Sequence, residues 1–178
     1  MEVLLHSCCF VCSIETVEHF KKEGHKLKLF WYNPNIHPYK EYEARLKALK
    51  AYAKGKELDL YVNDFYGLRY FIKNLNSEFD NRCSFCYKDR LTNTAKFAKQ
   101  NGFDAFSTTL LYSPYQDHEN IKKIGEQIAK EEGVEFLYKD LRSKFRQGQK
   151  KARETGFYMQ KYCGCIFSEQ ERYLKKHL

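Results

Sequence analysis

Short apolar runs alternate along the chain with longer segments in which apolar residues recur every three or four positions. The first pattern predicts buried β-strands and the second predicts amphipathic helices. Strands are expected at residues 2–5, 26–33, 58–64, 105–111 and 134–140. Helices are expected at residues 13–24, 39–54, around 66–76, from near Cys83 to Gly102 and at 117–133, with further helical segments from about Phe145 interrupted by "YCGC". In the first helix, Ser13 is the expected N-cap and Gly24 the stop.

This alternation indicates a parallel sheet with helices on both faces. We therefore predict an α/β fold in a single domain over residues 1–178, with an open five-stranded sheet ordered 3-2-1-4-5 and a C-terminal helical extension from about residue 145. Such sheets bind ligands beyond the carboxyl ends of the strands at which the winding reverses. Those are strands one and four, which lead into "HSCCFVCS" and "YSPYQDH".

The composition is that of a folded protein, with 43% hydrophobic residues, 16% aromatic residues and 3 prolines. The N-terminal apolar run is short and soon interrupted, so we expect no signal peptide, no membrane span and a cytoplasmic location. Cytosolic thiols are kept reduced. The seven cysteines are therefore interpreted as metal ligands or redox groups rather than as disulfides.

The cysteines form three groups: Cys8, Cys9 and Cys12; Cys83 and Cys86; Cys163 and Cys165. Four thiolates can bind zinc or an iron–sulfur cluster. Iron–sulfur is favoured because adjacent cysteines suit one small ion poorly and because the first group lies at the predicted crevice. Structural zinc stays an alternative. The three remaining thiols could hold most of a second metal site, or Cys163 and Cys165 could be a strained redox pair.

The formal net charge of +8 favours a polyanionic partner, although a lysine- and glutamate-rich, thermally robust surface has a similar balance. Basic residues gather just before the last thiols. A charge run is often only a solvated surface, but its position next to "YCGC" favours contacts with nucleic acid. The expected tRNA-binding residues are Lys144, Arg146, Lys150, Lys151 and Arg153.

The segments "LLHSCCFVCS", "NRCSFCYKDRL" and "FRQGQKKARETGFYMQKYCGCIFS" closely resemble the three cysteine blocks of the QueH family of epoxyqueuosine reductases. The resemblance runs from Leu4 to about Ser168. It implies reduction of the epoxide of epoxyqueuosine to queuosine at the wobble position of a tRNA anticodon stem-loop. It also implies a 4Fe-4S cluster, a nearby second mononuclear iron and a HUP-like, PP-loop-related fold. No S-G-G-x-D-S phosphate loop follows strand one, so ATP use is not predicted.

On this resemblance we expect Cys8, Cys9, Cys83 and Cys86 to bind the cluster. Cys12, Cys163 and Cys165 are then expected at the second metal, although spacing alone cannot order Cys8, Cys9 and Cys12. Side chains cannot supply two electrons, so the reaction needs the cofactor and a low-potential donor such as ferredoxin or flavodoxin. An iron–sulfur-dependent tRNA thiolation enzyme and a zinc-stabilised RNA-binding module without catalysis are the alternative functions.

Proton donors should come from the segment after strand four. The candidates there are Tyr112, Tyr115, Asp117 and His118. Asp117 could equally be the N-cap of the next helix and His118 a residue of its first turn. We expect His6 to be a buried histidine with satisfied hydrogen bonds rather than a ligand, and His37 to be a loop residue that could contact substrate.

Overall fold

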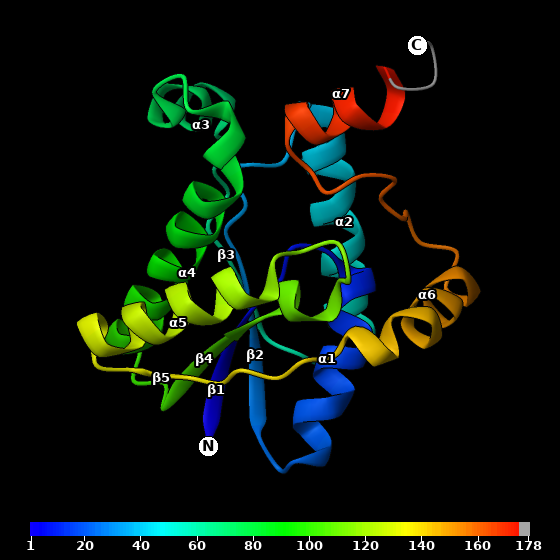
Figure 1. Cartoon of the computed structure of the whole chain (residues 1–178). Coiled ribbons are helices and arrows are strands. Elements are labelled where there is room, and N and C mark those ends of the chain that lie inside the picture. The colour runs from blue at the N-terminus through cyan, green and yellow to red at the C-terminus, as the bar shows by residue number, and fades with distance from the viewer. Residues whose placement is uncertain (175–178) are drawn as a thin grey trace.

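The computed structural model describes residues 1–174, which fold around a parallel five-stranded sheet (Figure 1). The strand order is β3-β2-β1-β4-β5, which confirms the predicted fold class and winding. The strands are β1 (Glu2–His6), β2 (Lys26–Trp31), β3 (Leu60–Val62), β4 (Ala105–Thr108) and β5 (Glu135–Phe136).

Helices cover both faces of the sheet, with α1, α2 and α6 on one side and α4 and α5 on the other (Figure 1). The α-helices are α1 (Phe10–Lys22), α2 (Tyr39–Gly55), α3 (Leu68–Leu75), α4 (Arg82–Gln100), α5 (His118–Glu132), α6 (Phe145–Glu154) and α7 (Ile166–Leu174). Three 3₁₀ helices link them, η1 (Phe79–Asn81), η2 (Thr109–Tyr112) and η3 (Arg142–Lys144). The helices α6 and α7 form the predicted C-terminal extension.

The central strands are apolar on both faces because helices cover both. Val3, Leu4 and Leu5 of β1 are fully buried, as are Ala105 and Phe106 of β4. These two strands pair in register from Val3 with Ala105 to His6 with Thr108. The core therefore fixes where the carboxyl ends of β1 and β4 meet.

The predicted N-cap of the first helix is wrong. The helix begins at Phe10, and Cys9 is its N-cap, with its Sγ accepting a hydrogen bond from the Cys12 backbone N–H at 3.3 Å. The Ser13 hydroxyl lies inside the helix and donates to the Cys9 carbonyl at 2.8 Å. Gly24 follows the helix at φ +84°, which confirms it at the stop. The cysteine group is thus part of the cap rather than of the preceding loop.

Strands β2, β3, β4 and β5 are all shorter than predicted. The Thr108 hydroxyl accepts a hydrogen bond from the Leu110 backbone N–H at 3.2 Å and so caps η2, which ends the strand. After Phe136, only Leu137 continues the pairing, through its backbone N–H to the Phe106 carbonyl at 2.9 Å. The early turn after β4 brings η2 beside the cysteines that follow β1.

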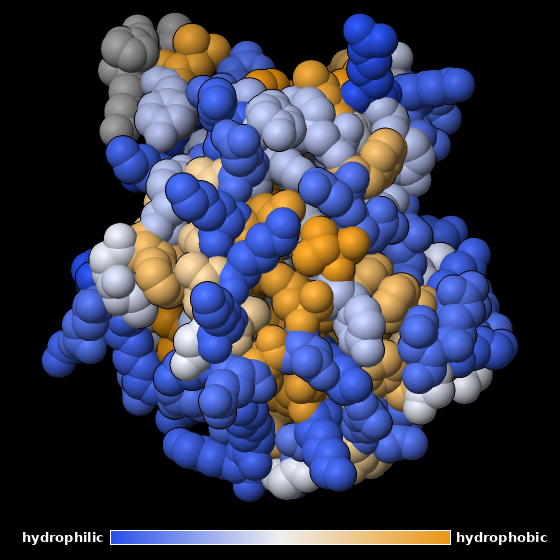
Figure 2. Space-filling model, turned by 180° about the vertical axis from the view of Figure 1, so that it is seen from behind, coloured by the Kyte–Doolittle hydropathy of each residue, from blue (hydrophilic) through white to orange (hydrophobic). Residues whose placement is uncertain are grey.

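The face seen from behind is largely hydrophilic, with apolar side chains exposed near its middle (Figure 2). No helix among residues 1–174 is long and apolar enough to cross a membrane.

Candidate functional site

The floor of the site forms where β1 and β4 end. The ring Nδ1 of His6 lies 3.0 Å from the Thr108 hydroxyl, and its Nε2 lies 3.2 Å from the Tyr32 carbonyl. Burial lowers the pKa of His6 to about 4, so the ring is neutral at pH 7. As expected, His6 is a buried histidine with satisfied hydrogen bonds. It fixes the point at which the chain leaves β1.

Three thiols gather immediately beyond this floor. The Sγ atoms of Cys8, Cys9 and Cys12 all lie within 4.8 Å of one another, and all three residues are buried. Cys9 is the N-cap of α1 and Cys12 lies in its first turn, so the cap geometry turns both side chains toward Cys8. The Thr109 hydroxyl at the start of η2 lies 3.4 Å from Cys8 Sγ.

The local hydrogen bonds favour a thiolate at Cys8. Contacts from the Cys12 and Cys9 side chains hold the pKa of Cys8 well below its usual range. Burial raises the pKa of Cys9, and the hydrogen bond to Cys8 raises that of Cys12. Thiolates are the form of cysteine that binds metals. A site that already stabilises one thiolate among three thiols suits a metal ion.

The other four cysteines form a second neighbourhood. Cys83 and Cys86 lie in the first turns of α4, and Cys86 packs with Cys165 against Phe71 and other apolar side chains. Burial raises the pKa of Cys86, and charges on Cys163, Cys165 and Cys83 raise it further. Such mutual effects require proximity, so segments distant in sequence converge here.

Residues 155–165, the C-terminal strap, carry the last two thiols to the site. Arg45 of α2 is buried and donates to the carbonyls of Cys163 (2.8 Å) and Tyr162 (2.9 Å). Gly164 lies at φ +152°, a conformation that side-chain-bearing residues rarely adopt, and its carbonyl accepts from the His37 backbone N–H at 2.8 Å. The glycine of "YCGC" therefore allows the sharp turn between the two cysteines.

A buried arginine lies between the two thiol groups. Arg90 is 2% exposed, and its Nε donates to the Cys86 carbonyl at 3.1 Å. Burial alone would lower the pKa of Arg90, but the charges of Cys86, Cys163 and Cys8 raise it. Its Nη2 is buried and has no hydrogen-bond partner within residues 1–174. The guanidinium is thus positioned to offset negative charge on sulfur and to donate to a bound molecule.

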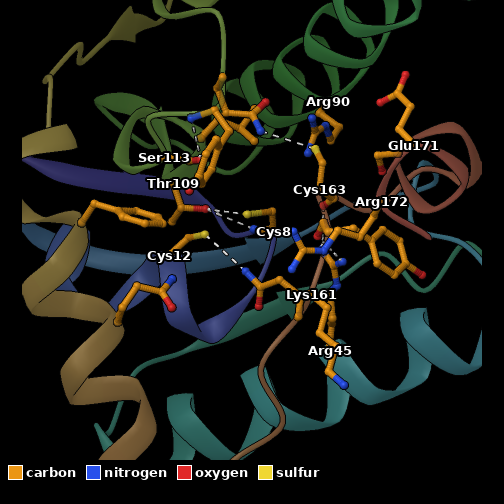
Figure 3. Close-up of a pocket in the computed structure, with 18 residues that line it drawn as sticks. Cys8, Cys12, Arg45, Arg90, Thr109, Ser113, Lys161, Cys163, Glu171 and Arg172 are labelled. Atoms are coloured by element: carbon orange, nitrogen blue, oxygen red, sulfur yellow. Dashed lines mark hydrogen bonds between the residues drawn. The ribbon is translucent and has the colours of Figure 1, made fainter. Parts of the chain in front are cut away.

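The two thiol groups border one cavity of about 460 Å³ (Figure 3). Cys8, Cys12 and Cys163 line it, and Figure 3 shows Arg90 next to Cys163. The volume is within the range of pockets that hold one small organic molecule. The further lining residues are Arg45, Thr109, Leu110, Ser113, Tyr115, Gln116, Phe145, Gln149, Gln160, Lys161, Tyr162, Ser168, Glu171 and Arg172.

Comparison with known proteins places this chain in a family. The family model described as "Epoxyqueuosine reductase QueH" matches residues 3–171. The chain belongs to the QueH family.

Two of the relatives are similar to this chain over nearly their full length. The epoxyqueuosine reductase QueH of Dehalococcoides mccartyi is 36% identical over 174 residues, which cover 98% of this chain and 96% of the relative. The QueH of Thermotoga maritima is 35% identical, with 96% and 91% covered. A solved structure titled as a predicted subunit of tRNA methyltransferase from Methanocaldococcus jannaschii aligns with a TM-score of 0.60 at 14% identity, covering 99% of this chain and 88% of that chain. At that identity the likeness concerns the fold alone.

The donor set of this QueH chain suits metal binding. The group Cys8, Cys9 and Cys12 supplies three converging sulfur ligands, which is typical of a site for a soft or borderline metal. Among the described residues, no other set of three potential ligands is as close.

The four predicted proton donors differ in position. Tyr115 lines the cavity, whereas the buried Tyr112 hydroxyl donates to the Phe145 carbonyl at 2.7 Å. Asp117 is the N-cap of α5, accepting from the Asn120 backbone N–H at 3.1 Å. His118 is buried in the first turn, with Nε2 3.0 Å from the Ser113 carbonyl. Their catalytic roles stay predictions, and only Tyr115 among them reaches the cavity.

The five predicted tRNA-binding residues also differ in position. Lys151 pairs with Glu15 (2.7 Å) and Glu18 (2.6 Å) of α1 and so attaches α6 to the core. Lys144, Arg146, Lys150 and Arg153 are exposed. These four are the residues of the stretch that are free to reach a phosphate backbone.

Sequence reasoning missed two buried arginines and two glutamines of the site. The Gln116 amide donates to Cys163 Sγ at 3.4 Å, and the Gln160 amide donates to Cys9 Sγ at 2.8 Å. Arg45 lies on the apolar face of α2 with Leu46, and Arg90 lies on the apolar face of α4 with Leu91. An arginine within the apolar stripe of a helix was the available signal.

Proposed function

We propose that this protein reduces the epoxide of epoxyqueuosine to the alkene of queuosine at the wobble position of a tRNA. One observation carries the proposal. Cys8, Cys12 and Cys163, from two distant segments, line a cavity at the winding reversal of the sheet in a chain that belongs to the QueH family, and Cys86 of a third segment packs with Cys165. The reaction consumes two electrons and two protons and releases water, so it needs a redox cofactor.

The proposed cofactors are a 4Fe-4S cluster and a second, mononuclear iron. When bound, they would supply one-electron transfer and Lewis-acid chemistry. The contacts favour Cys83, Cys86, Cys163 and Cys165 as cluster ligands and Cys8, Cys9 and Cys12 as ligands of the second iron. The division expected from sequence places Cys8 and Cys9 with Cys83 and Cys86. We propose a different division because Cys8 and Cys9 lie with Cys12.

The protein's own groups would position the substrate and stabilise charge. Arg90 Nη2, unpaired within the described chain, is available to donate a hydrogen bond to the epoxide oxygen as the C–O bond breaks. Of the four predicted proton donors, Tyr115 is the residue that lines the cavity. The exposed cations of α6 would hold the phosphate backbone of the anticodon stem-loop. Ferredoxin or flavodoxin is the proposed class of electron donor.

Conversion of the nucleoside is the direct test. Protein reconstituted with iron and sulfide under anaerobic conditions is incubated with epoxyqueuosine-containing tRNA and a low-potential reductant, and the nucleosides are analysed by mass spectrometry. We expect the mass of epoxyqueuosine to be replaced by that of queuosine, without ATP. Unchanged epoxide after confirmed iron loading would contradict the proposal. A colourless, zinc-loaded protein would instead support the RNA-binding module, and an ATP requirement would support a thiolation enzyme.

The division of ligands is tested with two serine variants. Cys9→Ser should keep the brown cluster chromophore and lose about one iron per chain, since it removes one ligand of the second iron. Cys163→Ser should lose most of the visible absorption. Iron analysis and absorption spectra check both variants. If Cys9→Ser abolishes the chromophore while Cys163→Ser keeps it, the division expected from sequence is correct.

A further inference from the structure

The most exposed large hydrophobic side chain of the described residues lies at the mouth of the cavity. Tyr115 is 82% exposed, whereas the next, Tyr39, is 50% exposed. An aromatic ring this exposed keeps most of its apolar surface available for contact with a partner. Tyr115 is nevertheless one of the residues that line the cavity.

The loop around Tyr115 is held on both sides. The Tyr115 backbone N–H donates to the Ser113 hydroxyl at 3.3 Å, and the next residue, Gln116, accepts from the Tyr87 hydroxyl at 2.9 Å. The Gln116 amide also donates to Cys163 Sγ. A ring on an anchored loop loses little conformational freedom when a ligand binds.

Phe145 supports the ring from one side. The two rings meet edge to face, with centroids 5.7 Å apart and an interplanar angle of 85°. Phe145 itself lines the cavity and is the first residue of α6. The next residue, Arg146, is exposed. The exposed ring of Tyr115 therefore packs on the residue that precedes an exposed cation. Aromatic rings combined with cations bind the bases and phosphates of single-stranded nucleic acids.

We propose that Tyr115, supported by Phe145, is a stacking site for an unpaired nucleobase next to the one that enters the cavity. The inference rests on the proposed function for the identity of the RNA, an anticodon loop. The cavity has the size of a site for one small molecule, so the neighbouring nucleotides stay at its mouth. Stacking is indifferent to base identity, because every base has a π face. The role belongs to the ring of Tyr115 and not to its hydroxyl.

The test measures binding and stacking separately from catalysis. The holoenzyme is titrated, without reductant, into a fluorescently labelled anticodon stem-loop that lacks the epoxide, and Kd is measured by anisotropy. A second RNA carries 2-aminopurine beside the wobble position, because stacking on an aromatic ring quenches its fluorescence. Tyr115→Ala should raise Kd about 5- to 140-fold and abolish the quenching. Tyr115→Phe should retain both.

Tyr39→Ala is the matched control, since Tyr39 is also exposed but does not line the cavity. It should bind as the wild type does. Equal Kd values and equal quenching for Tyr115→Ala and wild type would overturn the stacking site. So would a loss in Tyr115→Phe as large as in Tyr115→Ala, because that result assigns the effect to the hydroxyl. If the wild type binds and quenches but fails to convert epoxyqueuosine, the proposed function fails and the stacking site stands. A wild type that binds no RNA refutes both.

Discussion

His37 shows how one residue connects a loop to the site. Its Nδ1 accepts a hydrogen bond from the Ile166 backbone N–H at 3.3 Å, and its Nε2 lies 2.9 Å from the Pro34 carbonyl. These partners require the neutral ring, with its proton on Nε2. His37 is predicted to be a loop residue that could contact substrate. It does lie in a loop, but it is fully buried and does not line the cavity, so it positions the C-terminal strap rather than a ligand.

Protonation of His37 should therefore destabilise the fold. Burial lowers its pKa to about 4, below the unfolded value of 6.5. The stabilisation is complete above about pH 6.5 and is lost as the pH falls toward 4, because the unfolded chain binds the proton first. Between pH 7 and pH 5 the wild type should lose about 2 kcal/mol more unfolding free energy than His37→Gln. Urea unfolding of the holoenzyme at both pH values measures this difference. Equal losses would show that His37 does not titrate as described.

The residue scale also marks a limit of sequence reasoning. The cysteine groups are visible because their spacing is local. The partners of Arg90 come from the loop after β1, from α4 and from the strap, and their proximity depends on the fold. The same holds for the division of the thiols, since Cys12 joins Cys8 and Cys9 through the cap geometry of α1. The spacing of residues along the chain does not predict which side chains at the N-terminus of a helix face a distant segment.

At the scale of elements, the strand order and every long helix followed from hydrophobic periodicity. Two of the errors fall where side chains compete with the backbone ladder. Thr108 ends β4 by capping η2, and the Cys9 thiol replaces the expected Ser13 as the cap of α1. Both exceptions lie at the carboxyl ends of β1 and β4. Local rules were thus weakest where the site is built.

The attachment of α6 gives a prediction at this scale. The Lys151 ammonium pairs with the buried Glu15, whereas the neighbouring Lys150 is exposed. Lys151→Ala should lower the unfolding free energy by about 1 to 2 kcal/mol, between the values for exposed and buried pairs, because it leaves the Glu15 carboxylate without its partner. Lys150→Ala is the matched control and should leave stability unchanged. Urea unfolding followed by circular dichroism compares the two variants. Equal stability would show that α6 does not depend on this pair.

At the scale of the molecule, cations flank the cavity on two sides. Arg146 and Lys150 project from α6, while Lys161 and Arg172 line the cavity itself, where Figure 3 shows both near Arg45. The excess of +8 is therefore arranged in part around the opening rather than being only a solvated surface. A polyanion that lies across the mouth would contact both sides at once, with the aromatic ring of Tyr115 at the rim.

Salt dependence of RNA binding tests this arrangement. Each phosphate contact contributes about 0.7 to the slope of log K against log salt for a single-stranded segment, because binding releases counterions. Replacing Arg146, Lys150 and Arg153 together by alanine should reduce the slope by about 2 and weaken binding most at low salt.

Lys99→Ala is the control. Lys99 is exposed near the end of α4. That end of α4 leads to the start of β4, where the Asp104 backbone N–H donates to the Glu2 carbonyl, at the end of the sheet opposite the cavity. It should leave the slope unchanged. Anisotropy titrations of the anticodon stem-loop at several salt concentrations measure the slopes. If the triple variant and Lys99→Ala give the same slope, the phosphate backbone of the RNA does not cross α6. The cations that line the cavity would then have to hold the RNA alone.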